Sequence, residues 1–166
     1  MLKLKKDKVY IGVVRQGGKF DKLIKWWENS EHSHAFIFRD GEKIEALLTG
    51  VKLRNFTSYS GDWIYDIYEH PAMTELENSC IWQDGLNIVK KKVNYDFKGV
   101  FHFVLWFIKQ DPKAFFCSEL VAYLFNLNNK RFSAEVPEEV TPEDITKSKQ
   151  LIKVGSLKKG QDVRFI

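Results

Sequence analysis

The sequence predicts a single domain that contains both strands and helices. Its 166 residues are 44% hydrophobic and 29% charged, which is the composition of one ordinary globular domain. Segments with strand-like alternation are interleaved with segments whose apolar residues fall three and four positions apart, as on one face of a helix. The chain contains neither internal repeats nor a linker rich in Pro, Gly or Ser. We therefore expect residues 1–166 to form one domain.

The strands are predicted from β-branched and aromatic residues bounded by turn signals. The first expected strand, 8–15, ends before Gly17-Gly18. The next two form a hairpin, in which residues 34–39 alternate, Asp40-Gly41 supplies a two-residue turn, and residues 42–48 return. Further strands are expected at 51–56, 62–69, 151–154 and 163–166.

The helices are predicted from apolar residues at helical spacing and from end signals. We expect helices at 20–29, at 72–94 with a break or bend near Asp84-Gly85, at 97–109, at 117–127, and a short one after Thr141. Thr141 is a typical N-cap, and Pro142 suits the first helical position. The longest apolar stretch, 100–108, has about half of the roughly 20 residues that a membrane-spanning helix needs.

The charge of the chain is positive and unevenly distributed. The net charge is +4, and residues 1–25 and 147–166 hold eight and six Lys or Arg. These ends are either solvated lysines or a patch for nucleic acid, anionic lipid or an acidic substrate, and composition does not choose between them. We expect neither a signal peptide nor a transmembrane segment, and hence a cytoplasmic protein.

Cys117 is the first candidate for chemistry. It lies at the predicted start of a helix, where unbonded backbone N–H groups stabilise a thiolate and could also hold an oxyanion. Cys80 is too far away in sequence to form a metal-binding pair with it, and we expect both to be free thiols. The alternative for Cys117 is a buried structural cysteine.

The hairpin selects a base for this thiol. If Asp40 and Gly41 are the turn, the residue numbers of paired positions sum to 81, so Phe36 pairs with Glu45. His34 then lies on the same face of the sheet as Glu45 and is its diagonal neighbour. A carboxylate beside an imidazole fixes its tautomer and stabilises the imidazolium. His32 shares that face too, so His32-x-His34 could be half of a metal site, but no further ligand has suitable spacing. His70 and His102 are interpreted as a turn residue and a core residue.

Several segments together resemble one family of enzymes. The chain resembles the circularly permuted branch of the NlpC-type papain-like cysteine hydrolases, which includes YiiX-like proteins and relatives of lecithin:retinol acyltransferase. The matching segments are Ser33-His34-Ala35-Phe36-Ile37, Ile44-Glu45-Ala46 followed by Gly50-Val51, Tyr95-Asp96-Phe97, and Phe116-Cys117-Ser118-Glu119-Leu120-Val121.

The resemblance implies both a fold and a set of roles. The fold it implies is α+β, a small antiparallel sheet or half-barrel packed against helices, with the nucleophile at a helix N-terminus. It implies Cys117 as nucleophile, His34 as base and then acid, Glu45 as the partner that orients His34, and Tyr95 as a residue of the substrate pocket. No metal or organic cofactor is implied. Many relatives carry export signals or envelope anchors, which we do not find in this chain.

The expected function is that of a cysteine hydrolase or acyl transferase. Such an enzyme would be an amidase, a peptidase or a thioesterase-like protein. It would act on an amide or ester bond through an acyl-enzyme on Cys117. Its substrate would be a small molecule, a peptide or a lipid acyl compound. The alternative is a catalytically silent binding module whose basic ends contact nucleic acid or anionic lipid. The sequence does not determine the substrate, the acceptor or the oligomeric state.

Overall fold

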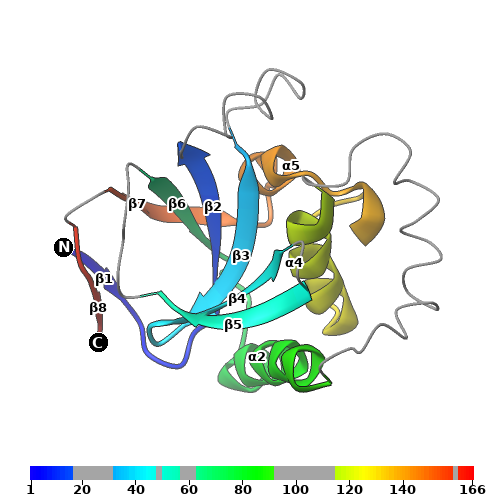
Figure 1. The fold of residues 1–166 in the computed structure, drawn as a ribbon, viewed down its shortest axis with the longest axis horizontal. Helices are drawn as coiled ribbons and strands as arrows, with labels where there is room; N and C mark the ends of the chain where they lie inside the picture. The colour runs from blue at the N-terminus through cyan, green and yellow to red at the C-terminus, as the bar shows by residue number, and fades with distance from the viewer. Residues whose placement is uncertain (17–31, 48–49, 57–62, 92–114, 159–160) are drawn as a thin grey trace.

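A six-stranded antiparallel sheet is the centre of the fold (Figure 1). The structure is a computed structural model, and it describes residues 1–16, 32–47, 50–56, 63–91, 115–158 and 161–166. The spatial order of the strands is β5-β4-β3-β2-β6-β7. Their bounds are Tyr10–Gln16 for β2, His34–Arg39 for β3, Glu42–Leu47 for β4, Gly50–Asn55 for β5, Ile64–Glu69 for β6 and Ile152–Leu157 for β7.

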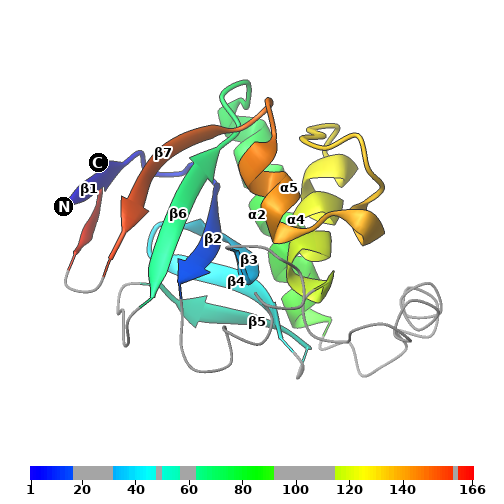
Figure 2. The same ribbon diagram turned by 90° about the horizontal axis from the view of Figure 1, so that it is seen from above.

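Helices cover one face of this sheet, as Figure 2 shows. They are α2 (Glu75–Lys90), α4 (Phe115–Leu127), α5 (Pro142–Lys147) and the short 3-10 helix η1 (Pro137–Glu139). Alternation along each strand sends one set of side chains to these helices, and these side chains form the larger apolar core with residues of α2 and α4. The core contains Ile11, Val13, Ala35, Ile37, Ile44, Ile81, Val121, Leu124 and Phe125.

The opposite face of the sheet carries a second, largely aromatic core. Its buried members include Tyr10, Phe36, Phe38, Phe56 and Leu157. Beside it the two ends of the chain pair in parallel as β1 (Leu2–Leu4) and β8 (Val163–Phe165), so that the termini lie close together (Figure 1). The basic ends of the sequence therefore meet in space.

The hairpin of β3 and β4 has the register that the sequence predicts. Asp40 and Gly41 have φ angles of 49° and 87°, the pair of positive values that a type I′ turn requires. The observed Cα partners Ile37↔Ile44, Phe38↔Lys43 and Arg39↔Glu42 all sum to 81, which confirms the expected pairing. His34 and Glu45 consequently lie on the face of the sheet that carries Phe36.

Most other predicted elements are confirmed where the structure describes them. The mixed α+β class is confirmed, and α4 begins two residues earlier than expected, which makes Cys117 its third residue. Thr141 caps α5 with Pro142 at its start, and Asp144 completes a capping box. The expected helices at 20–29 and 97–109 lie outside the described residues.

The expected break in one helix was wrong, the start of that helix was misplaced, and one strand was not expected at all. Helix α2 continues through Asp84-Gly85 without the expected break, because Gly85 is there to let the helix approach the sheet: a Cβ on it would lie 2.8 Å from Ile44 Cδ1. The helix also begins after Thr74, whose capping box with Glu77 was a sequence signal. Strand β1 was not expected, because a three-residue strand that pairs across the whole chain has no local pattern.

Among the helices that the structure describes, none combines the length and the apolar character needed to cross a membrane. The longest, α2, carries charged residues along its length.

Gly12 in β2 offers a test of the aromatic core. A Cβ at Gly12 would lie 2.3 Å from Cζ of Phe36, a fully buried ring. We expect Gly12→Ala to lower the free energy of unfolding by about 1–3 kcal/mol, because the ring must move within a filled core. The measurement is the shift of the urea midpoint at unchanged m-value.

Gly155→Ala is the matched control for this substitution. Its added Cβ would meet Leu2 Cδ1 at 2.8 Å, the movable end of a side chain in the terminal strand, so the loss should be smaller. Equal losses in the two variants would contradict the packing described for Phe36.

Candidate active site

The site lies where β3 and β4 separate. The ladder between them ends at the pair Ile37↔Ile44, although β3 extends back to His34 and β4 onward to Leu47. Hydrogen-bonded pairs alternate along an antiparallel ladder, so the next β3 amide directed toward β4 is that of Ala35. That N–H donates to the sulfur of Cys117 instead of to a β4 carbonyl. The gap between the strands is thus closed by a side chain of α4.

Cys117 enters this gap from the first turn of α4, the helix that packs against both β3 and β4. The residue is buried, with 2% of its surface exposed. Its sulfur accepts hydrogen bonds from the backbone N–H groups of Ala35 and Ser118, and it hydrogen-bonds with the ring of His34. The thiol therefore lies among polar groups rather than in packed hydrocarbon.

The orientation of Cys117 is fixed by its neighbour. Ser118 is fully buried, and its hydroxyl donates to the carbonyl oxygen of Val140 at 2.6 Å. Val140 directly precedes the N-cap of α5. This hydrogen bond holds the first turn of α4 against the segment that leads into α5.

His34 connects the sulfur to a buried carboxylate. Its Nε2 lies 3.0 Å from Oε2 of Glu45, the diagonal contact that the hairpin register predicts. Because this nitrogen is occupied by the carboxylate, Nδ1 is the ring atom left to face Cys117. The side chain of Glu45 is 4% exposed and that of His34 is 23% exposed. The order along the contact is therefore sulfur, imidazole, carboxylate.

Glu45 is kept ionised by hydrogen bonds. Burial by itself raises the pKa of its carboxyl, but hydrogen bonds from His34 and Lys43 outweigh burial and lower the pKa to about 2. Lys43 Nζ lies 2.9 Å from Oε2, and Arg54 Nε lies 3.7 Å from Oε1. The carboxylate can therefore hold the ring and stabilise a positive charge on it.

The pKa values of Cys117 and His34 move in opposite directions. Burial raises the pKa of the thiol, but the positive charge of His34 and the hydrogen bonds at the sulfur lower it below its usual range. Burial likewise lowers the pKa of His34, whereas the charge and hydrogen bonds of Cys117 and Glu45 raise it to about 9. These shifts are those of a thiolate–imidazolium ion pair.

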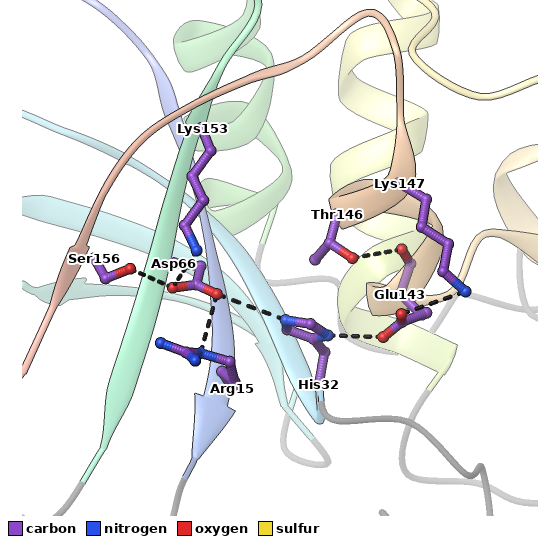
Figure 3. A network of polar contacts seen from close by, with 8 residues as sticks. All are labelled: Arg15, His32, Asp66, Glu143, Thr146, Lys147, Lys153 and Ser156. Carbon is purple, nitrogen blue, oxygen red and sulfur yellow. Dashed lines mark hydrogen bonds and ion pairs between the residues drawn. The ribbon is translucent and has the colours of Figure 1, made fainter.

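A network of ion pairs connects His32, which precedes the β3–β4 hairpin, to α5 (Figure 3). His32, which is 8% exposed, lies two positions before His34. Its Nδ1 is 2.7 Å from Oε2 of Glu143 in α5, and its Nε2 is 3.7 Å from Oδ2 of Asp66 in β6. The imidazole thus bridges a helix and the sheet close to where the site forms.

Asp66 is the buried centre of this network. It receives a hydrogen bond of 2.6 Å from Ser156, and Lys153 and Arg15 lie 3.0 and 3.2 Å from its oxygens. Burial raises the pKa of Asp66, but the hydrogen bonds from Ser156 and Lys153 and the nearby cations lower it. The network connects β6, β7 and α5 and compensates the buried charge of Asp66, so removing one of its partners would leave that charge uncompensated.

The structure brings together three of the four residues predicted for the site. Cys117 contacts His34 and His34 contacts Glu45, while Tyr95 lies outside the described residues. Neither Cys80 nor Cys117 forms a disulfide bond, as expected. Within the described ranges no group of three or more His, Cys, Asp or Glu could hold a metal ion, so the alternative of a site at His32 and His34 gains no support.

Sequence reasoning missed several residues of this region. Lys43 could have been found, because it alternates onto the same face as Glu45. The Ala35 amide could not, because its role depends on where the β3–β4 ladder stops. Nor did any local pattern connect His32 to Asp66 and Glu143, which are distant in sequence.

No family model matches the chain, and the comparison with curated proteins finds no match either. The roles of the residues are therefore inferred from their geometry and chemistry.

The ion pair predicts the titration of Cys117. In a Cys80→Ser background, the ultraviolet absorbance of a thiolate should appear at a pH below the usual thiol range, because His34 stabilises the anion. In His34→Ala the titration should move upward, because burial still disfavours the thiolate and the positive charge of His34 is lost. The measurement is the absorbance difference from the same background carrying Cys117→Ala. A titration of Cys117 that is identical with and without His34 would contradict the contact.

Proposed function

We propose that this protein is a cysteine hydrolase or acyl transferase that cleaves an amide or ester bond through an acyl-enzyme on Cys117. The observation that carries the proposal is the contact of the Cys117 sulfur with an imidazole whose other nitrogen lies 3.0 Å from a buried carboxylate. An adjacent base and a third group that orients the base are the features that activate a nucleophile.

In the first half of the reaction the thiolate attacks the substrate carbonyl carbon and forms a new S–C bond. The carbonyl oxygen becomes an oxyanion, which backbone N–H groups in the first turn of α4 can stabilise. As the oxyanion collapses, the bond to the leaving oxygen or nitrogen breaks. His34 gives its Nδ1 proton to that atom, which leaves a thioester and a neutral imidazole held by Glu45.

In the second half water or another nucleophile attacks the thioester carbonyl. Neutral His34 accepts the proton of this nucleophile, the S–C bond breaks, and the thiolate–imidazolium pair is restored. With water the product is a carboxylic acid, and with another acceptor it is a transferred acyl group. The residues account for both outcomes without a further catalytic group.

The order of the residues along the chain supports a permuted papain-like architecture. The base and its carboxylate partner come first, on β3 and β4, and the nucleophile follows on α4, which packs against those same strands. We propose this architecture as the finer description of the α+β fold. The basic termini paired in β1 and β8 keep the alternative of a binding module open, and the contact of Cys117, His34 and Glu45 favours the enzyme.

The proposal is tested by trapping the acyl-enzyme. We expect para-nitrophenyl acetate to acetylate the protein at Cys117 alone, a mass increase seen in the intact protein and absent in Cys117→Ala. Glu45→Gln should slow acylation roughly 10²–10⁴-fold, because the ring loses its orienting carboxylate.

Two control variants accompany these changes. Cys80→Ser removes the exposed thiol, and Glu42→Gln removes an exposed carboxylate on the other face of β4. Neither should alter the rate. Equal acylation of native protein and Cys117→Ala would exclude Cys117 as the nucleophile.

A further inference from the structure

Three cations lie on the same face of β4 and β5 as Glu45. The register pairs Lys43 with Arg54 and Glu45 with Lys52, and residues directly opposite each other in an antiparallel pair share a face. His34 is on this face too, since it contacts Glu45. We name Lys43, Lys52 and Arg54 the β4–β5 rim.

The rim carries more positive charge than the carboxylate of Glu45 can neutralise. Lys43 is mostly buried, over the Phe36 ring and 2.9 Å from Glu45. The side chain of Arg54 is 55% exposed and only 3.7 Å from the same carboxylate, while Lys52 is exposed. Glu45 is the one acidic residue on this face of the two described strands, so an excess of two positive charges faces solvent. The ion pair of Cys117 and His34 is neutral overall and does not change this excess.

The other charged cluster beside the site has two carboxylates, Asp66 and Glu143, for its three cations. In the network of Figure 3, Arg15 and Lys153 lie within 3.3 Å of Asp66, and Lys147 lies within 3.3 Å of Glu143. The rim differs because its three cations, of which Lys52 and Arg54 are exposed, have only the carboxylate of Glu45 on this face of the two described strands. Exposed charges beside a reaction site act mainly on the binding of charged ligands.

The rim lies on the side of the site where the leaving group of the substrate would bind. In the proposed reaction His34 donates its proton to the leaving group, so the leaving group lies on the His34 side of the sulfur. The rim surrounds Glu45, the hydrogen-bond partner of His34, and so lies on that same side. We propose that the leaving group of the substrate carries an anion, a carboxylate or a phosphate, that Lys52 and Arg54 bind. This inference rests on the proposed function.

The test compares esters that share an acetyl group and differ in the leaving group. The probes are para-nitrophenyl acetate and its ring-carboxylated and ring-phosphorylated analogues. We expect kcat/KM of the native protein to be higher for an anionic ester than for the neutral ester. The anionic ester with the higher kcat/KM, carboxylated or phosphorylated, identifies the anion that the rim binds better. Lys52→Gln and Arg54→Gln should each lower the ratio of anionic to neutral kcat/KM about three- to tenfold, and added salt should lower it in the native protein.

Two further variants make the result specific to the rim. Lys52→Glu should lower the ratio further than Lys52→Gln, because it places a repelling charge opposite Glu45. Lys3→Gln, which removes an exposed cation from β1 at the far side of the fold, should leave the ratio unchanged (Figure 1).

The outcomes separate the two proposals. A ratio near one in the native protein, or a ratio that Lys52→Gln and Arg54→Gln leave unchanged, would overturn the role of the rim while hydrolysis by Cys117 stands. Failure of the neutral ester to react at Cys117 would overturn the proposed function and this inference with it.

Discussion

The site depends on a backbone amide that the sheet does not use. If the β3–β4 ladder continued past Ile37↔Ile44, the N–H of Ala35 would bond to β4 and the strands would lie too close for a side chain. Because the ladder stops there, the amide donates to the sulfur of Cys117. Cys117, on the helix packed on one face of the sheet, can therefore contact His34, whose side chain lies on the opposite face. An unpaired buried amide is costly, so this hydrogen bond also stabilises the separated strands.

The charges around this gap have different tasks. Glu45 is buried but ionised, because it receives hydrogen bonds from both His34 and Lys43. Asp66 plays a comparable part in the network that connects His32 to the sheet and to α5. In each case a buried carboxylate lies next to a histidine: Glu45 is 3.0 Å from His34, and Asp66 is 3.7 Å from His32, whose hydrogen-bond partner is Glu143. The sheet thus supplies fixed charges, while α4 supplies the reactive group.

Local patterns in the sequence predict much of this arrangement. The Asp40-Gly41 turn determines the register, and the register determines that His34 meets Glu45, so this half of the site follows from a two-residue loop. The approach of α4 to the gap does not follow in this way, because it depends on packing between segments far apart in sequence. Gly85 shows the same limit. In the sequence a glycine at this position indicates a break in the helix, but in the structure the helix is continuous and Gly85 permits its close packing against the sheet.

The most direct test of the central claim is the protonation state of His34. Nitrogen NMR of the imidazole, titrated in the native protein and in Cys117→Ala, reports the charge of the ring itself. The ion pair predicts that His34 is protonated at neutral pH and loses its proton near pH 9 in the native protein, since its pKa is raised to about 9, and at distinctly lower pH without the sulfur. A neutral imidazole at pH 7 in the native protein, or an identical titration in the variant, would contradict the claim.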